Sequence, residues 1–527
     1  MARILLLLCL IICRSYSLNI LVYSPRFGHS HTNFLAKICD TLAEAGHRVV
    51  FLEPLFLDKV SAKGPTHPGV EKIELPAPES VRKVFSAQKS DTGGSARWET
   101  TLWGDFAVMK KYVALLRFAA LEHLKGFYAD PDFLSKIRGY HFDLAVSQPM
   151  EASGYALFYK LGLEKFVTVF SANPGATYPV IFGAHSAVSW VPTMLSRGIE
   201  KMGFRERALN WYYTLLERPV FDSYEGFDEF MFTQESEYPG SKELMLRSSY
   251  LLLNSEPLLD FPKPLHAKIV YIGGIAVPKS VEPLSEEFDR ILGERSHSVF
   301  ISFGSMAKSA DMPLASRLGL IAAMRMLPDV TFIWKYENLS DPLVKELPQN
   351  VYPVAWAPQL ALLADKRLSA FVSHAGAGSQ QEVAASGRKV LCIPIFADQF
   401  ANCQQLARVG AAQIFDKNDL NDEEKLVKAV KELLENDGLS KNAEQLAEMI
   451  AKKPFTASET LLRHVEFAAK YGPLPQLDPY GRQLSFIQYY LLDVMGILIA
   501  ALLFTIFIAW KIFQRLFGAI FRKKKVE

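Results

Sequence analysis

Apolar residues follow two periods along this chain, and the change between them marks alternating strands and helices. Residues 19–23 alternate and carry branched side chains, as buried strands do, and a loop with glycine and proline follows them. In residues 32–45 the apolar positions recur at helical spacing, and Gly46 ends that pattern as a C-cap. Because residues 49–52 begin a second strand pattern, this order predicts the start of a parallel sheet.

The same alternation continues along the chain in two series, and residues 274–296, with several Pro and Glu, are interpreted as the linker between them. A chain of 527 residues is long enough for two domains. We therefore predict an α/β fold with one Rossmann-like domain over residues 18–284 and another over 285–484. Helical residues 436–468 are candidates to return to the first domain. Further strands are expected at residues 142–146, 166–170, 299–302, 330–334, 370–373 and 390–394.

Two long helical stretches, residues 98–127 and 190–232, are rich in aromatic side chains. Core packing is the favoured interpretation. The alternatives are a pocket for a substrate and a surface that rests on a membrane.

Residues 1–17 have the features of a secretory signal peptide. Arg3 supplies a positive charge, residues 4–12 form an apolar run, and residues 15–17 provide a small-x-small cleavage site. A buried strand or a membrane anchor is the alternative, but this run is too short to span a bilayer.

A second apolar run, residues 494–510, contains no charge and predicts a transmembrane helix. Its 17 residues would form a helix about 26 Å long, enough for a thin membrane such as that of the endoplasmic reticulum. Asp493 precedes the run and basic residues follow it, which places the tail, residues 511–527, in the cytosol and the bulk of the chain in the lumen. A buried core helix is the alternative, which the basic tail disfavours.

Lys524 and Lys525, the fourth and third residues from the end, resemble a dilysine retrieval signal, although a basic flank alone would also supply lysines. With the signal peptide and the span, they predict a single-pass type I protein of the endoplasmic reticulum membrane. The sequon at Asn338 is compatible with a lumenal surface.

Composition excludes several classes of protein. The net charge of +2 and a half-hydrophobic composition argue against nucleic-acid binding and against disorder. Outside the signal peptide the cysteines are Cys39, Cys392 and Cys403, an odd and sparse set that predicts core residues and no disulfide framework. No dinucleotide fingerprint follows either first strand, and no Asp-x-Asp metal motif occurs in the second half. The sequence leaves homo-oligomerisation open.

The most informative stretch is residues 356–399, which contains W-x-x-Q, S-H-x-G-x-x-S-x-x-E and P-x-x-x-D-Q. Its small-residue loop opens a helix, and backbone N–H groups at such a terminus suit a diphosphate. His374, at the end of an apolar strand, can donate to the same phosphate. Trp356 offers a plate for a base, and Gly304 and Ser305, at the end of another strand, offer a second backbone cradle.

These spacings resemble the signature of the UDP-glycosyltransferase family, in particular animal UDP-glucuronosyltransferases. The resemblance implies a GT-B architecture, in which two Rossmann-like domains face a cleft, and a UDP-sugar as donor without a resident cofactor or metal. It implies that Asp398 and Gln399 bind the transferred sugar and that Glu382 binds ribose hydroxyls. The residues expected to hold UDP are Gly304, Ser305, Trp356, Gln359, Ser373, His374, Gly376, Gly378, Ser379 and Glu382.

The loop departs from the family pattern at two positions. Ala375 stands where vertebrate members have glycine, and Gly378 stands where they have asparagine. Loss of the asparagine removes a phosphate donor, and Ser379 is the candidate to replace it.

Transfer to a hydroxyl with inversion needs a base, and a neutral histidine is suited to this because its ordinary pKa is about 6.5. His31 falls where the family has its catalytic histidine, at the predicted start of a helix that disfavours its protonation. A capping role for His31 and a base role for His29 are the alternatives. The residue expected to orient the base is Gln148, where the family has aspartate; Asp143 and Glu151 are nearby carboxylates.

We therefore predict a membrane-bound UDP-glucuronosyltransferase that acts on small lipophilic acceptors with His31, Gln148 and Glu151 as the catalytic set. Transfer of glucose is the alternative within the class. Because Gln148 carries no charge, an inactive UDP-sugar-binding membrane protein is the alternative from another class.

Overall fold

The computed structural model describes residues 17–56, 62, 64–87, 94–99, 102–173, 175, 177–194, 196, 198–278 and 280–523. The predicted signal peptide, apart from Ser17, and the two lysines of the predicted retrieval signal lie outside these residues. The chain divides into two compact units, Met1–Leu477 and Asp478–Glu527.

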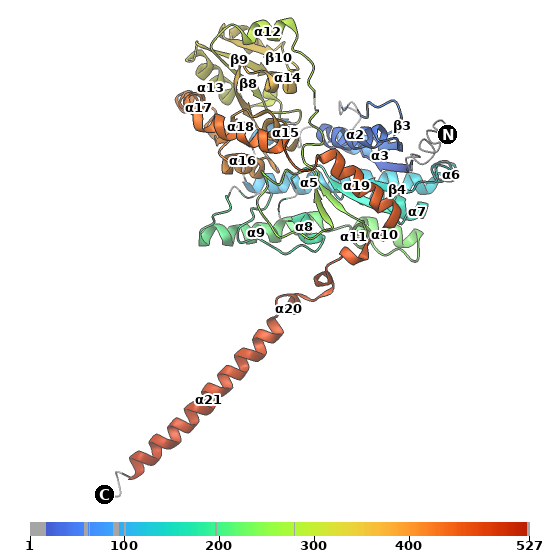
Figure 1. Cartoon of the computed structure of the whole chain (residues 1–527), viewed down its shortest axis with the longest axis vertical. Helices are drawn as coiled ribbons and strands as arrows, with labels where there is room; N and C mark the ends of the chain where they lie inside the picture. Colours follow the sequence, from blue (N-terminus) through green and yellow to red (C-terminus); the bar gives the residue numbers. More distant parts are fainter. Residues whose placement is uncertain are drawn as a thin grey trace, which may run out of the picture. The chain divides into compact units, whose positions relative to one another are not determined.

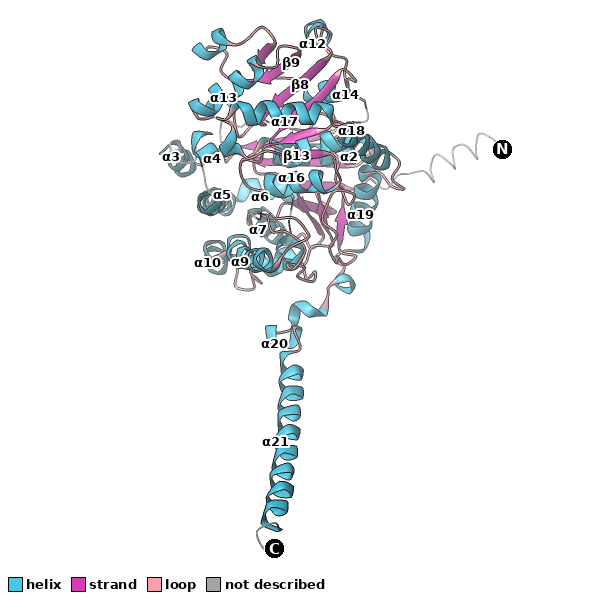
Figure 2. Ribbon diagram, turned by 90° about the vertical axis from the view of Figure 1, so that its left-hand side faces the viewer, coloured by secondary structure: helices cyan, strands magenta, loops and turns pink. Residues whose placement is uncertain are grey.

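Two parallel sheets form the framework of the first unit (Figure 1). The first has the strand order β3-β2-β1-β4-β5-β6-β7, and the second has the order β10-β9-β8-β11-β12-β13. Figure 2 shows helices on both sides of the strands, as expected because parallel sheets are stable when both faces are covered. The predicted pair of Rossmann-like domains in a GT-B arrangement is confirmed.

The central strands match the sequence prediction, and the strands that it missed lie at the edges of the sheets or, in the case of β6, next to an edge. These strands are short or carry polar residues and proline, so their apolar pattern is weak. The strands are β1 Asn19–Tyr23, β2 Arg48–Pro54, β3 Val70–Leu75, β4 Leu144–Ser147, β5 Phe166–Phe170, β6 Leu251–Leu253, β7 Ile269–Tyr271, β8 His297–Ser302, β9 Val330–Lys335, β10 Val351–Val354, β11 Leu368–Ser373, β12 Val390–Cys392 and β13 Ala412–Ile414.

Two helices of the predicted site begin earlier than expected. Helix α2 begins at His29 instead of residue 32, because Gly28 takes the extended N-cap conformation, and α15 begins at Ala377 instead of Gln380. The α-helices are α2 His29–Glu44, α3 Glu79–Ala87, α4 Gly94–Glu99, α5 Leu102–Ala129, α6 Pro131–Arg138, α7 Ser153–Leu161, α8 Thr177–Ile181, α9 Phe204–Phe221, α10 Glu225–Gln234, α11 Ser241–Leu246, α12 Glu286–Leu292, α13 Leu314–Arg325, α14 Gln359–Ala364, α15 Ala377–Ser386, α16 Gln399–Arg408, α17 Glu423–Glu435, α18 Asp437–Ala451, α19 Ala457–Tyr471, α20 Phe486–Tyr489 and α21 Leu492–Lys523. Short 3₁₀ turns lie at Ser309–Asp311, Pro342–Glu346, Lys417–Asp419, Pro475–Leu477 and Tyr480–Gln483.

Helix α19 belongs to the core of the first domain although it follows the second domain in the sequence. Leu461, Val465 and Ala468 are fully buried in one cluster with the β1 residues Ile20 and Val22. Figure 1 shows α19 near α2, which it contacts. The C-terminal part of the globular unit therefore holds the two domains together.

The aromatic-rich stretches do not behave alike. Helix α5 contributes Leu116 and Leu124 to the first core, as core packing predicts. Helix α9 exposes apolar residues, among them Phe204 (82%), Trp211 (56%) and Leu215 (49%), and only its C-terminal end, with Val220 and Phe221, joins the first core, so core packing holds for only part of this helix.

The cysteines and the sequon lie where the sequence predicts them. Cys39, Cys392 and Cys403 are free and buried, and each packs in a hydrophobic cluster. Asn338 is exposed and accepts a hydrogen bond from the N–H of Ser340 at 3.2 Å in a turn.

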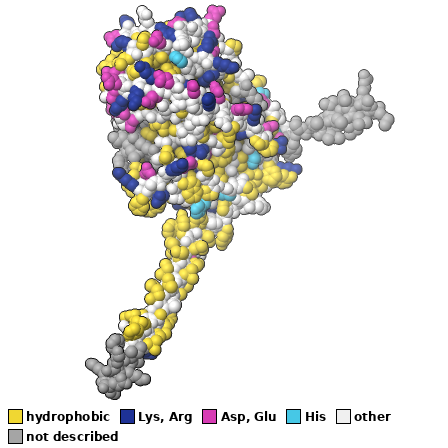
Figure 3. Space-filling view, turned by 60° about the vertical axis from the view of Figure 1, so that its left-hand side comes forward, with side chains coloured by type: hydrophobic (Ala, Val, Ile, Leu, Met, Phe, Trp, Pro, Cys, Tyr) yellow, Lys and Arg dark blue, Asp and Glu magenta, His cyan; other side chains and the backbone are white. Residues whose placement is uncertain are grey.

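The second unit is dominated by the long helix α21. Its stretch Leu492–Phe517, 26 residues, is long and apolar enough to cross a membrane. Figure 3 shows apolar side chains along its surface. The apolar helix is longer than the predicted 17 residues because it continues through Lys511 and Arg515.

Candidate functional site

The candidate base of the first domain lies where neighbouring parallel strands end. Strand β1 leads through a loop to His31 in α2, β4 is followed directly by Gln148, and β5 is followed directly by Ser171. Because β1, β4 and β5 are neighbours in the sheet, their carboxyl ends bring these three side chains together.

His31, Gln148 and Ser171 form a closed triangle of hydrogen-bonding atoms. His31 Nδ1 lies 2.9 Å from Gln148 Oε1 and 2.5 Å from Ser171 Oγ. Ser171 Oγ donates to Gln148 Oε1 at 2.7 Å. Ser171, which the sequence analysis missed, carried only the weak signal of a polar residue directly after a buried strand.

The triangle determines which nitrogen of His31 can act as a base. Gln148 Oε1 can only accept, so a hydrogen bond between it and Nδ1 requires the tautomer with the hydrogen on Nδ1, in which Nε2 keeps its lone pair. Burial lowers the pKa of His31, and the hydrogen bond with Gln148 raises it in part. The neutral ring is therefore poised to accept a proton at Nε2.

The two carboxylates near Gln148 do not reach His31. Glu151 Oε2 accepts from the backbone N–H of Ser153 at 2.6 Å and from the Ser153 hydroxyl, and burial raises its pKa to about 7. Asp143 accepts from the N–H of Asn19 at 2.8 Å, beside the start of β1. Glu151 as a direct partner of the base is therefore a wrong prediction, because its carboxylate is turned into the start of α7.

His29 lies on the donor side of the site. Its Nε2 is 2.9 Å from Asn33 Nδ2, and its ring stands edge-on to Trp356 with centroids 6.2 Å apart. His29 is therefore placed beside the indole and not beside Gln148.

The second domain surrounds His374 with two glycines. A Cβ on Gly304 would lie 2.6 Å from the imidazole of His374, and one on Gly376 would lie 2.8 Å from its Nε2. Burial and the charge of Lys335 lower the pKa of His374 to about 3, so the ring is neutral. Its Nδ1 is buried without a hydrogen-bond partner in the described part of the chain. These glycines are required because their backbones pack directly against the ring.

Ala375, the residue that departs from the family pattern, adopts a left-handed backbone with φ of 54°. This conformation costs an L-residue about 1–2 kcal/mol, whereas glycine adopts it freely. The loop therefore retains the shape that glycine would give it, at a cost in stability.

Lys335 is a further residue of this site that the sequence analysis missed. Its Nζ donates to Gly304 O at 2.6 Å, lies 3.4 Å from a carboxylate oxygen of Glu337, and stands 5.2 Å from the centre of the Trp356 ring. Trp356 itself is 61% exposed, as a plate for a ligand must be. Lys335 ends the buried strand β9, where a single lysine in the sequence gives little sign of a function.

Helices α14 and α15 bring Gln359, Ser379 and Glu382 together. Gln359 Nε2 donates to Ser379 Oγ at 3.0 Å and to Glu382. Burial raises the pKa of Glu382 to about 7. Gly378 lies in the first turn of α15 with open space at its Cβ position, and Ser305 is exposed. The predicted nucleotide residues from Trp356 to Glu382 thus lie in, or just before, the two helices that follow β10 and β11.

Asp398 connects the two domains. It accepts from the N–H of Asn173 at 3.3 Å and from Asn402 Nδ2 at 3.1 Å, and burial raises its pKa. Asn173 Nδ2 donates to Asn402 Oδ1 at 3.0 Å, and Asn402 also donates to Ala375 O at 2.9 Å. Asn173 and Asn402, both missed from the sequence, link the loop after β5 to the candidate sugar site and the donor loop.

Two other predicted residues shape their own loops. Gln399 Oε1 accepts from the N–H groups of Ile395 at 2.9 Å and Phe396 at 3.0 Å. Ser373 Oγ accepts from the N–H of Ala375 at 3.1 Å. Each side-chain oxygen thus binds backbone N–H groups of its own loop and stabilises the conformation of that loop.

Helix α4 of the first domain inserts Trp98 into the core of the second. Trp98 is 4% exposed, its ring centre lies 5.0 Å from that of Phe303, and its Nε1 donates to Lys308 O at 3.1 Å. Arg97 donates to Met306 O at 2.5 Å. These contacts brace the loop that holds Gly304 and Ser305.

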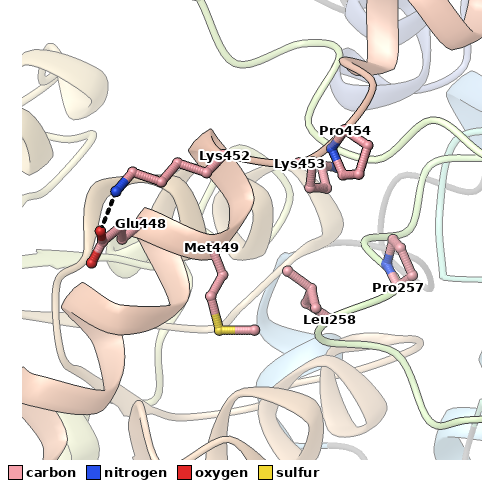
Figure 4. A pocket seen from close by; sticks show the side chains of 7 residues that line it. All are labelled: Pro257, Leu258, Glu448, Met449, Lys452, Lys453 and Pro454. Atoms are coloured by element: carbon pink, nitrogen blue, oxygen red, sulfur yellow. Dashed lines mark hydrogen bonds and ion pairs between the residues drawn. The ribbon is translucent and has the colours of Figure 1, made fainter.

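A surface pocket of about 530 Å³ lies elsewhere, where the chain crosses from α18 to α19 (Figure 4). Leu258 and Met449 supply apolar lining, and Lys452 is paired with Glu448 at 2.5 Å. It contains none of the predicted site residues.

Comparisons with known proteins identify the family of the chain and its fold. The family model described as "UDP-glucoronosyl and UDP-glucosyl transferase" matches residues 19–527. A putative UDP-glucuronosyltransferase of Caenorhabditis elegans, ugt-56, is 28% identical over 467 residues and 86% of each chain. UDP-glucosyltransferase 2 of Dactylopius coccus is 25% identical, over 99% of this chain and 98% of that one. The solved structure of a UDP-glucosyltransferase from Polygonum tinctorium, capable of glucosylating indoxyl, has a TM-score of 0.59 at 15% identity and covers 87% of this chain and 100% of that one.

The close approach of Gly304 to His374 makes a prediction for Gly304→Ala. The added methyl group would lie 2.6 Å from the imidazole, and φ of 81° already disfavours alanine. We expect UDP affinity, measured by calorimetry, to fall about tenfold or more, which corresponds to about 1.4 kcal/mol. Gly226→Ala is the matched control because nothing lies within 4 Å of its Cβ position. Equal UDP affinity in the Gly304→Ala variant would show that the ring does not depend on this contact.

Proposed function

The chain belongs to the UDP-glucuronosyl and UDP-glucosyl transferase family and is a UDP-glycosyltransferase, and we propose that it transfers glucuronic acid from UDP-glucuronate to the hydroxyl of a small lipophilic acceptor. The observation that carries the proposal is the hydrogen-bond triangle in which His31 Nδ1 faces Gln148 Oε1 at 2.9 Å at the end of the first sheet. His31 is proposed to act as the general base, with inversion at the anomeric carbon.

The donor is proposed to bind to the second domain. Trp356 stacks on uracil, and Glu382 accepts hydrogen bonds from the ribose hydroxyls. The N-terminus of α15 and the backbone at Gly304 hold the diphosphate, because N–H groups and the helix dipole favour negative charge there. Lys335, 2.6 Å from Gly304 O, is close enough to this loop to offset part of the diphosphate charge.

Asp398 is proposed to bind hydroxyls of the transferred sugar. Its position supports this, since it lies at the start of α16 and contacts Asn173 of the first domain at 3.3 Å. A sugar that occupies this position faces the domain that carries His31. The acceptor oxygen then attacks the anomeric carbon while the bond to UDP breaks and His31 Nε2 takes the proton.

Two other functions are motivated by particular observations. A relative named as a UDP-glucosyltransferase matches as much of the chain as the relatives named as UDP-glucuronosyltransferases, so transfer of glucose is the second candidate. The uncharged Gln148 beside His31 motivates a UDP-sugar-binding membrane protein without activity.

The proposed location is the endoplasmic reticulum membrane, with the globular unit in the lumen. It is supported by the apolar helix Leu492–Phe517, by the basic residues near the C-terminus and by the signal-like N-terminus. Transfer to lipophilic acceptors is compatible with attachment to a membrane, in which such compounds accumulate.

The donor-site roles predict different losses in three variants. Trp356→Ala should weaken UDP binding by about 1–3 kcal/mol, the usual value of one base–aromatic stack. Glu382→Ala should weaken it also, by loss of the ribose contacts. Asp398→Ala should leave UDP affinity nearly unchanged and impair the use of the whole UDP-sugar. Calorimetry with UDP, compared with turnover of the sugar donor, separates these roles, and an equal loss of UDP affinity in all three variants would contradict them.

The proposed reaction predicts a large effect of His31→Ala. With UDP-glucuronate and a phenolic acceptor, mass spectrometry should show a glucuronide, and the variant should turn over about 10²–10⁴-fold more slowly with little change in UDP affinity. Because burial lowers the pKa of His31, kcat/KM of the natural chain should remain high until the pH falls below about 6.5.

The same assay decides between the candidates. Product from UDP-glucose but not from UDP-glucuronate would favour glucose transfer. UDP binding without consumption of any donor, including UDP-N-acetylglucosamine, would favour the inactive binding protein. A fully active His31→Ala variant would transfer the base role to His29.

The proposed topology predicts protection of the globular unit. In sealed microsomes, protease should remove only the residues that follow the span. Joint replacement of Lys524 and Lys525 by serine should let the protein leave the endoplasmic reticulum, as cell fractionation would show. Digestion of the globular unit in intact vesicles would contradict the proposed orientation.

A further inference from the structure

The atoms that surround His31 Nδ1 carry no formal charge. Its partners are the amide oxygen of Gln148 at 2.9 Å and the hydroxyl of Ser171 at 2.5 Å. The nearby carboxylates of Glu151 and Asp143 bind the N–H groups of Ser153 and Asn19 instead. Among the described residues, no carboxylate is within hydrogen-bonding distance of His31.

An uncharged partner orients a histidine but does not stabilise its protonated form. A carboxylate beside Nδ1 would attract the imidazolium that forms when Nε2 takes a proton, whereas an amide offers only its dipole. Burial adds to this effect because it disfavours the charged ring. His31 is thus well oriented to accept a proton, but it is a weak base.

We infer that the acceptors of this enzyme are compounds with an acidic hydroxyl, such as phenols, in preference to aliphatic alcohols, and that Ser171 is the positioning residue that holds His31 in its active tautomer. The inference rests on the proposed function of His31 as base. It names the class of acceptor from the chemistry of the base, independently of the shape of the acceptor pocket.

The preference follows from the acidity of the acceptor hydroxyl, which decides how readily its proton moves to His31. A phenolic hydroxyl has a pKa of about 10, as in tyrosine, whereas water, with a pKa of about 15.7, represents a hydroxyl that is not activated by a ring. The acceptor oxygen forms the bond to the anomeric carbon, the bond from that carbon to UDP breaks with its electron pair on UDP, and the proton moves to His31 Nε2. With a weak base, this transfer limits the rate more severely for the less acidic hydroxyl.

Gln148 offers a conservative way to add the missing charge. Its Nε2 is buried and has no hydrogen-bond partner in the described part of the chain. Gln148→Glu keeps the length of the side chain and the oxygen that faces His31, and it replaces an amide nitrogen that binds nothing. Gln148→Asp is a second variant, in which the charge is carried on a shorter side chain.

The experiment compares full-length chains in detergent with UDP-glucuronate, or with the sugar donor that proves active, and a graded series of acceptors. The series contains substituted phenols of decreasing acidity and an aliphatic alcohol of similar size. In the natural chain kcat should fall more than a hundredfold from the most acidic phenol to the alcohol. Gln148→Glu or Gln148→Asp should reduce that ratio at least tenfold, by raising kcat on the alcohol with little change in the KM of the donor.

Ser171 is tested by a pair of variants in the same assay. Ser171→Ala should lower kcat about tenfold on every acceptor at unchanged KM for the donor, because the tautomer of His31 is held less firmly. Ser171→Thr, which keeps the hydroxyl, should restore most of the rate. Loss of activity in both variants, or in neither, would contradict the positioning role.

Other outcomes separate this inference from the proposed function. If His31→Ala is inactive while the natural chain uses phenol and alcohol at similar rates, the base is correct and the preference for acidic acceptors is wrong. The same dependence on acidity in the natural chain and in both Gln148 variants would also overturn the inference. A fully active His31→Ala variant would overturn the proposed function, and the inference with it.

Discussion

A buried amide pair joins the two domains, and the geometry of the whole site depends on it. Asn173 Nδ2 donates to Asn402 Oδ1 at 3.0 Å, while Asn402 also holds the carbonyl of Ala375 in the donor loop and the carboxylate of Asp398. Asn173 lies two residues after Ser171, which positions His31. One short segment after β5 therefore contacts the proposed base at one end and the candidate sugar site at the other.

The domains are also held by an exchange of elements. The first domain places Trp98 in the second core, and the chain returns from the second domain to bury α19 against the first sheet. The core of the second domain thus contains Trp98, which belongs to the first domain in the sequence. The core of the first domain contains α19, which follows the second domain in the sequence. Removing such a segment leaves a cavity in a close-packed interior, which costs several kcal/mol. We therefore expect neither half to be stable when it is expressed alone.

Site residues that lie close together in the sequence could be predicted, whereas residues that meet only in the folded chain could not. Trp356, His374 and Glu382 lie within one stretch, so their spacing alone indicates a nucleotide-sugar site. Ser171 and Asn402 are distant polar residues whose roles arise only when strands and domains meet. Glu151 shows the converse error, because closeness in sequence to Gln148 suggested a contact that the start of α7 prevents. The strands at or next to the sheet edges were missed because they are short or interrupted by polar residues, so they carry little apolar pattern.

In the proposed donor site, the burial of Glu382 would link nucleotide binding to proton release. Burial raises the pKa of this carboxyl to about 7, close to neutral pH. A ligand whose hydroxyls donate to it favours the ionised form, so binding expels part of a proton into the solvent. If Glu382 has the proposed role, mild acidification would therefore lower the affinity for the nucleotide while the contacts themselves stay the same. Nucleotide binding and proton release would then be thermodynamically linked at this site.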